Sequence, residues 1–200
     1  MVRAILEGRK TQTRRVFDAK KLSKMSGQTW THAGIGAFHQ AFPESDWPWR
    51  ARAGEFNVWS PVFACPYGKP GDRLWVRESF RQMQDGIDYK ADHEYRIGFT
   101  WKPSIHMFRK DSRITLEITN IRVERLREIS EDNAKAEGVS IGWYVRDTPD
   151  GEERVPTDFV SGFRHAWDKI NGKKHPWASN PWIWVIEFKK VNCQSTNDAG

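Results

Sequence analysis

Residues 5–15 of this 200-residue chain read ILEGRKTQTRR, and they join the end of a short helix to a dense basic run. Just upstream, Val2, Ile5 and Leu6 have the i, i+3, i+4 spacing that predicts one apolar face of a helix. Gly8 can end that helix, because glycine adopts the left-handed conformation without a Cβ penalty. The seven residues that follow carry four cations, two threonines and no acid.

Lys10 and Thr13 are the pair in this stretch that suggests chemistry. If the basic run forms a helical turn, residues i and i+3 are neighbours, and the amine lies beside the hydroxyl. The three nearby arginines disfavour a further positive charge, so we expect a lowered pKa for Lys10. A neutral amine can take the proton of a threonine hydroxyl and make it a nucleophile. Two simpler interpretations stay open, a solvated basic face and a phosphate-binding site.

Composition narrows the class of protein. The net charge of +6 favours a polyanionic partner or substrate. Cys65 and Cys193 are the only cysteines and form no C-x-x-C motif, so we expect no disulfide framework, no zinc site and a cytoplasmic location. The chain has no apolar run of about 18 residues and no signal-peptide pattern, so we expect no membrane partner. We also expect no metal and no cofactor, and a monomer or small homo-oligomer.

A long irregular segment follows the basic stretch. Residues 23–54 are rich in Gly, Ser, Pro and aromatic residues and keep neither a period of 2 nor one of 3.6. Loops of this length in a compact domain are usually functional or mobile, so we predict a lid that borders the site. Its expected anchors are aromatic: Trp30, Phe38, Phe42, Trp47 and Trp49. His32 and His39 fit no zinc spacing, and we expect both at the surface.

Strands and a few helices are predicted over the rest of the chain. The expected strands are residues 56–63, 72–80, 95–101, 114–123 and 182–190, and the expected amphipathic helix is 157–171. Pro70-Gly71 indicates a type II turn, and residues 147–153 a further turn. The strand at 182–190 is apolar on both faces, so we expect it to be central. Without βαβ alternation, the fold class is α+β with an antiparallel or mixed sheet.

A short acid-bearing helix is predicted between Ser130 and Gly138. Ser130 suits the N-cap, Ile129 and Ala134 are spaced as a hydrophobic staple, and Gly138 ends the helix. Glu137 then lies at the helix C-terminus, where a carboxylate is unfavourable, and this suits a general acid. An ordinary exposed glutamate is the alternative. Arg77, near the end of the strand at 72–80, either faces the site or forms a surface ion pair with the next residue.

These motifs resemble those of a known family. ILEGRKTQTRR resembles the opening motif of the ASCH domains, a branch of the PUA-like superfamily associated with RNA and modified nucleosides. Gly8, Lys10 and Arg15 match the general pattern G-x-K-x-x-E-x-R, whereas Thr13 replaces its glutamate. That replacement is similar to the G-R-K-T-x-T-x-R motif of small ASCH amidohydrolases, which remove acyl groups from N4-acylcytidine. Further likeness lies in PGDRLWV at 70–76, ISEDNAKAEGV at 129–139 and WVIEFK at 184–189.

The resemblance implies both a fold and a site. The fold is a small PUA-like barrel flanked by helices, with one domain over residues 1–191, a long aromatic-rich loop insertion at about 17–69 and a polar tail at 192–200. Residues 17–69 and 82–112 resemble insertions of longer, phage-type ASCH proteins. In the family a short strand precedes the first helix. Because this chain begins at that helix, we predict a barrel edge that is open or filled by the insertion.

The implied activity is amide hydrolysis of a modified cytosine nucleoside. Thr13 would attack the acyl carbonyl, Lys10 would act as general base, and Glu137 would protonate the departing amine. The substrate would be held by Arg14, Arg15 and Arg77. Two other functions stay open. One is a non-catalytic RNA-binding module whose aromatic residues stack on bases, and the other is an ASCH-type ribonuclease.

Overall fold

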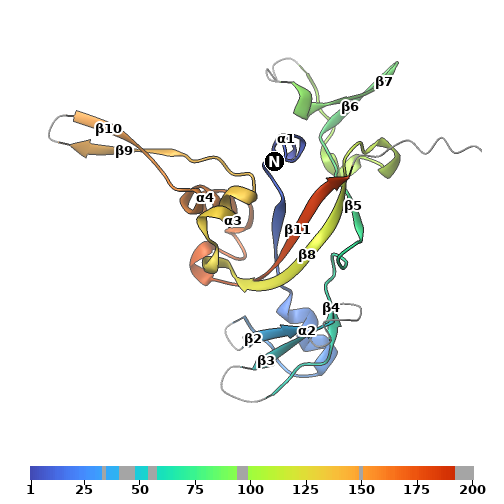
Figure 1. Ribbon diagram of the computed structural model, residues 1–200, viewed down its shortest axis with the longest axis vertical. Coiled ribbons are helices and arrows are strands. Elements are labelled where there is room, and N and C mark those ends of the chain that lie inside the picture. Colours follow the sequence, from blue (N-terminus) through green and yellow to red (C-terminus); the bar gives the residue numbers. More distant parts are fainter. Residues whose placement is uncertain (33–34, 41–47, 54–57, 94–98, 149–150, 192–200) are drawn as a thin grey trace, which may run out of the picture.

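The computed structural model describes residues 1–32, 35–40, 48–53, 58–93, 99–148 and 151–191. Over this part the chain is α+β, as predicted, and its main sheet curls into an antiparallel half-barrel (Figure 1). The sheet runs in the order β1 (Gln12–Val16), β11 (Trp182–Val191), β8 (Thr115–Arg125) and β5 (Arg73–Trp75). All three pairings are antiparallel.

The central position of β11 is confirmed. Residues 182–186 are all buried, so side chains on both faces of this strand contribute to the core. On one face, Trp184 and Ile186 pack with Ile118 and Ile121 of β8. On the other face, Ile183 and Val185 pack under two helices, α3 (Glu131–Ala136) and α4 (Phe159–Asn171). The two faces of the sheet therefore carry two different cores.

The predicted loop over residues 23–54 is wrong where the structure describes it. The segment contains the end of α2 (Ala19–Ser26), together with β2 (Ile35–Gln40) and β3 (Pro48–Ala53), which form a small sheet with the later strand β4 (Phe63–Ala64). Trp30 and Trp49 are buried, and Phe38 packs against the same core cluster, as the anchoring predicts; Phe42 and Trp47 lie outside the described residues. The strand predicted at 56–63 reduces to its last residue.

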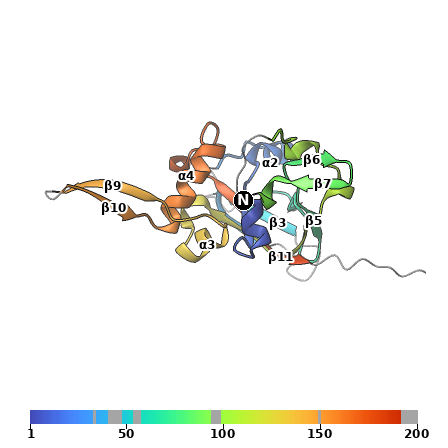
Figure 2. The ribbon, with the colours of Figure 1, turned by 90° about the horizontal axis from the view of Figure 1, so that it is seen from above.

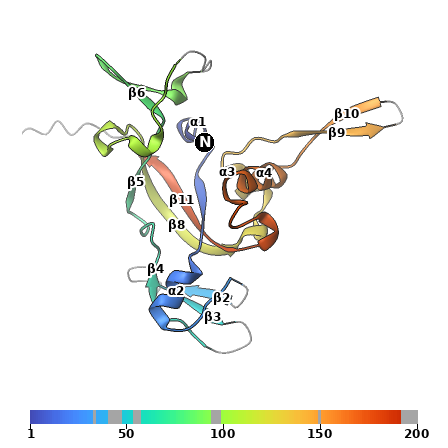
Figure 3. The ribbon, with the colours of Figure 1, turned by 180° about the vertical axis from the view of Figure 1, so that it is seen from behind.

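The α2–β2–β3 lobe lies at the end of the sheet away from α1 (Val2–Leu6) (Figure 1, Figure 3). It packs on the Trp184 face of the main sheet. The lobe therefore belongs to the core on that face, and it does not cover Lys10.

Two hairpins extend the fold. β6 (Phe80–Met83) pairs with β7 (Gly86–Tyr89), so the strand predicted at 72–80 is in fact split between β5 and β6. β9 (Trp143–Thr148) pairs with β10 (Gly151–Pro156) where only a turn was predicted, and this hairpin projects from the body of the molecule (Figure 1, Figure 2). The strand predicted at 95–101 lies mostly outside the described residues, and the tail at 192–200 wholly so.

Short 3₁₀ turns complete the described chain. They are η1 (Lys90–Asp92), η2 (Ser104–His106), η3 (Arg109–Asp111), η4 (Leu126–Glu128) and η5 (Trp177–Ser179). Gly71 has a φ of 90°, as the predicted type II turn requires. Within the described residues, no helix is long and apolar enough to cross a membrane.

Two predictions for the start of the chain are confirmed and one is wrong. α1 spans Val2–Leu6, and Gly8 follows it with a φ of 73°. The basic run beyond it is not a helical turn, because residues 12–16 form β1 and pair with β11. β1 has no neighbour on its other side within the described chain, so the sheet edge is open as predicted.

Candidate functional site

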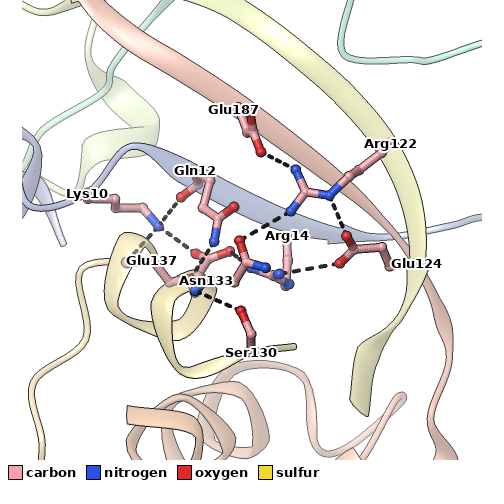
Figure 4. A network of polar contacts seen from close by, with 9 residues as sticks. All are labelled: Lys10, Gln12, Arg14, Arg122, Glu124, Ser130, Asn133, Glu137 and Glu187. Atoms are coloured by element: carbon pink, nitrogen blue, oxygen red, sulfur yellow. Dashed lines mark hydrogen bonds and ion pairs between the residues drawn. The ribbon is translucent and has the colours of Figure 1, made fainter. Parts of the chain in front are cut away.

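Lys10 and Glu137 meet in a buried ion pair at the junction of β1 and α3 (Figure 4). The Lys10 Nζ donates to Glu137 Oε2 at 2.7 Å, to the Glu137 carbonyl at 2.9 Å and to the Gln12 carbonyl at 2.8 Å. Lys10 is 7% exposed and Glu137 is 2% exposed. Three acceptors match the three donors of an ammonium, so this arrangement holds Lys10 as a cation.

Local sequence explains why two residues so far apart in the chain meet here. Ser130 caps α3 by accepting from the Asn133 N–H at 3.3 Å, and Glu137 is the C-cap residue, so both predicted helix ends are confirmed. Gly138 follows with a φ of 73° and no side chain. A Cβ at Gly138 would lie 2.7 Å from the Lys10 Cβ and 2.8 Å from the Ala4 Cβ. Glycine therefore permits the close approach that brings Lys10 beside Glu137.

The pair begins a chain of alternating charges. Arg14 Nη1 donates to Glu137 Oε1 at 3.1 Å, and Arg14 Nη2 lies 3.4 Å from Glu124 Oε2. Arg122 in turn bonds Glu124 and Glu187 (Figure 4). The order is Lys10, Glu137, Arg14, Glu124, Arg122, Glu187. Arg14 and Arg122 each lie between two carboxylates, whereas Lys10, at the start, pairs with one.

Burial governs the electrostatics of this site. Burial lowers the pKa of Lys10, and the Arg15 and Arg14 charges lower it further, while the ion pair with Glu137 opposes them. The predicted direction is thus confirmed, but desolvation rather than the arginines is the main cause. Burial also lowers the pKa of Arg14. The Arg14 Nε is buried with no hydrogen-bond partner among the described residues, and the guanidinium lies 5.7 Å from the centre of the Phe163 ring.

Thr13 does not join this group. Successive side chains of a strand point to opposite faces, and Arg14 reaches Glu137, so the neighbouring Thr13 points to the Trp184 face. The half-buried Thr13 makes no hydrogen bond to Lys10 in the described structure. Arg15 is exposed and, two residues along, shares the Thr13 side of the strand. The expectation that a helical turn places Thr13 beside Lys10 is wrong, because the segment is extended.

Arg77 also lies apart from the charge chain. Its guanidinium stacks on the Trp75 ring at 4.7 Å and donates to the Ile105 carbonyl at 3.3 Å. The alternative of an ion pair with Glu78 is wrong as well, because the buried Glu78 carboxylate accepts from Arg113 at 3.0 Å. None of these contacts involves Lys10, Arg14 or Glu137.

Sequence analysis missed the residues of the charge chain that come after Arg14. Glu124, Arg122 and Glu187 lie on β8 and β11, and Gln12 and Asn133 complete the polar group, with Gln12 donating to the Asn133 carbonyl. A signal was available in Glu187, which interrupts a buried apolar strand. A charge within an otherwise apolar strand suggests an ion-pair partner, and Glu187, whose side chain is 36% exposed, pairs with Arg122.

The lid and the histidines turn out differently from expectation. The described part of residues 27–54 packs on the Trp184 face, so it forms no lid over Lys10 and Glu137.

His32 is half-buried rather than at the surface, and its Nδ1 accepts from the Trp182 N–H at 3.1 Å. The His39 side chain lies outside the described residues. Among the described residues, no group of three or more His, Cys, Asp or Glu side chains could hold a metal ion.

The chain was also compared with known proteins. Neither a family model, nor a curated protein, nor a solved structure matches it.

Proposed function

We propose that this chain is an amidohydrolase that removes the acyl group from N4-acylated cytosine derivatives, on a PUA-like barrel of the ASCH kind. The observation that carries the proposal is the buried ion pair of Lys10 and Glu137, 127 residues apart. These are the two positions to which the family resemblance assigns the base and the acid. The curled antiparallel sheet supports the barrel.

The pair suits proton transfer in both directions. At 2.7 Å, a proton that passes from Lys10 to Glu137 yields a neutral amine and a carboxylic acid. The amine then takes a proton from the nucleophile as the acyl carbon is attacked. The carboxylic acid donates its proton to N4 as the C–N bond breaks. The products are the amine of cytosine and a carboxylic acid, and the site returns to its ion pair.

Arg14 supplies the group that stabilises developing negative charge. Its Nε–H is a buried donor without an acceptor among the described residues, which is uncommon in a folded protein. The acyl oxygen becomes negative during attack, and a donor aimed at it lowers the barrier. We assign Arg14 this role, whereas Arg15 and Arg77 form no hydrogen bond or ion pair with Lys10 or Glu137 among the described residues.

The strand geometry changes the proposed nucleophile. Since Thr13 points to the opposite face from Lys10, we propose that water attacks the acyl carbon and loses its proton to Lys10. Both side chains of the pair are buried, so the proposal requires β1 and α3 to open before a substrate binds.

Ultraviolet absorbance of N4-acetylcytidine tests this function. The wild-type chain should remove the acyl chromophore, and Lys10→Gln should lower turnover about 10²- to 10⁴-fold, as loss of a general base does. Thr13→Ala should keep turnover, with Thr11→Ala as its matched control. Loss of turnover in Thr13→Ala alone would restore threonine as the nucleophile. A wild-type chain that leaves the substrate intact would remove the hydrolase proposal.

A second candidate, single-stranded RNA binding, is favoured by the surface around β6. The Arg81 guanidinium stacks on Phe99 at 4.1 Å and lies 5.5 Å from the Trp101 ring centre, and Phe99 is 44% exposed. Cations interleaved with exposed aromatic rings suit base stacking. Fluorescence anisotropy with a labelled single strand tests it: Arg81→Ala and Phe99→Ala should weaken binding, while turnover of the cytidine substrate stays unchanged. The same incubation, resolved on a gel, tests for ribonuclease cleavage.

A further inference from the structure

A cleft of about 780 Å³ opens on the α2 side of the molecule, away from Lys10 and Glu137. It is formed where the start of α2, the segment after α2 and the loop after α4 converge. The polar side chains that line it are Asp18, Lys20, Thr31, His32, Lys174 and His175. The buried residues Phe17 and Trp30 form an apolar wall of the cleft. A volume of this size holds a ligand as large as a nucleotide.

The charge balance of the cleft is positive. Lys20 and Lys174 come from different elements, and neither ammonium forms an ion pair within the described residues. The one carboxylate, Asp18, is already engaged, because its Oδ1 accepts from the Lys20 N–H at 3.0 Å and the Lys21 N–H at 3.2 Å as the cap of α2. An anion entering the cleft therefore meets two lysines that form no ion pair among the described residues, and these outnumber the one carboxylate.

His32 adds a fixed hydrogen-bond donor. Because its Nδ1 accepts from the Trp182 N–H at 3.1 Å, the neutral ring carries its proton on Nε2. The ring packs edge-on against His175, with the centroids 5.8 Å apart. The Nε2–H has no partner among the described residues, so it is free to donate to a ligand.

We propose that this cleft binds a phosphate monoester, with Lys20 and Lys174 as charge partners and the His32 Nε2–H as a donor. A monoester carries close to two negative charges at neutral pH and has three acceptor oxygens, which two lysines and a donor complement. A diester carries one charge and is matched less well. The phosphate could belong to a free nucleotide or to the 5′ end of a nucleic acid. The proposal does not depend on the hydrolase site.

Calorimetry with AMP and adenosine tests the proposal on the full chain, since neither probe is an N4-acylcytosine. AMP should bind at least about tenfold more tightly than adenosine, and Lys20→Gln and Lys174→Gln should each weaken AMP binding about tenfold. Lys24→Gln, an exposed lysine of α2 outside the cleft, is the matched control and should bind as the wild type does. A short oligoadenylate, with and without a 5′-phosphate, tells a nucleic-acid end from a free nucleotide.

His32→Asn gives a second readout, because asparagine can keep an acceptor for the Trp182 N–H while the Nε2 donor is lost. This variant should weaken AMP binding while its unfolding midpoint stays close to that of the wild type. The proposal is overturned if neither phosphorylated probe binds better than its dephosphorylated form. It is also overturned if the two lysine variants bind AMP as tightly as Lys24→Gln.

Discussion

At the residue scale, Glu137 is the centre of the charged site because two cations share its carboxylate. Lys10 bonds one oxygen at 2.7 Å and Arg14 the other at 3.1 Å. Losing Glu137 leaves both cations buried without this anion, whereas losing Lys10 leaves Glu137 still paired with Arg14. The two partners of one ion pair are therefore unequal in what they contribute to stability.

Glu137→Gln should lower the free energy of unfolding by about 3–5 kcal/mol, the usual cost of breaking a buried ion pair. Lys10→Met should cost less, about 1–3 kcal/mol, since mainly the two carbonyl oxygens lose their donor. Urea denaturation of both variants measures the difference. Equal losses, or a larger loss for Lys10→Met, would show that Arg14 does not compensate Glu137.

Cys65 provides a pH-dependent test at the same scale. Burial raises the pKa of this thiol from 9.0 to about 11. A raised pKa in the folded state means stability that is fully present below pH 9 and is lost as pH rises through about 11. In a Cys193→Ser background, iodoacetamide should alkylate native Cys65 far more slowly at pH 9 than the unfolded chain. Cys65→Ala should flatten the alkaline loss of stability. An unchanged slope would assign that loss to Tyr67 and Tyr89, whose pKa burial also raises.

Lys10 and Glu137 could be found from sequence, whereas their geometry with Thr13 could not. A resemblance assigns residues to positions but says nothing about strand or helix, and K-x-x-T brings its ends together only on a helix. Gln12–Val16 is a strand because its backbone pairs with β11, a contact about 170 residues away in the chain. Glu187 is 65 residues from Arg122 in the chain, so their contact has no local signal either.

At the element scale, the end of α1 and both ends of α3 were predictable because their causes are local. Ser130, Gly138 and Gly8 behave as the capping rules require. The small sheet of β2, β3 and β4 was not predictable, because its strands are short and their stability comes from packing against the main sheet. In α4 the predicted start at residue 157 is two residues early, and Ile170 is 68% exposed instead of buried.

Gly138→Ala tests the contact between α3 and β1. A Cβ there would meet the Cβ atoms of Lys10 and Ala4 under 3 Å, in addition to the strain of a positive φ. Gly8→Ala is the matched control, with the same φ of 73° and nothing within 4 Å. We expect Gly8→Ala to cost about 1–2 kcal/mol and Gly138→Ala about 1–3 kcal/mol more. Similar losses in thermal unfolding would mean that the close approach is relaxed in solution.

At the scale of the whole molecule, the lobe of α2, β2 and β3 shares one core with the main sheet. Trp30, Ile35 and Trp49 of the lobe belong to the same buried cluster as Ile118 and Trp184. The Trp49 and Trp184 rings meet edge-on, with centroids 5.6 Å apart. A shared core predicts that lobe and sheet unfold together, as one domain with an insertion would.

Trp49→Ala separates this prediction from that of an independent lobe. Truncating a buried tryptophan should lower stability by about 3–5 kcal/mol. If the core is shared, amide hydrogen exchange of β8 and β11 should accelerate by the factor that corresponds to this loss, although neither strand is mutated. Phe108→Ala, at a side chain 69% exposed, is the control and should leave exchange nearly unchanged. Faster exchange confined to β2 and β3 would show instead that the lobe unfolds on its own, and would make the insertion a separate domain.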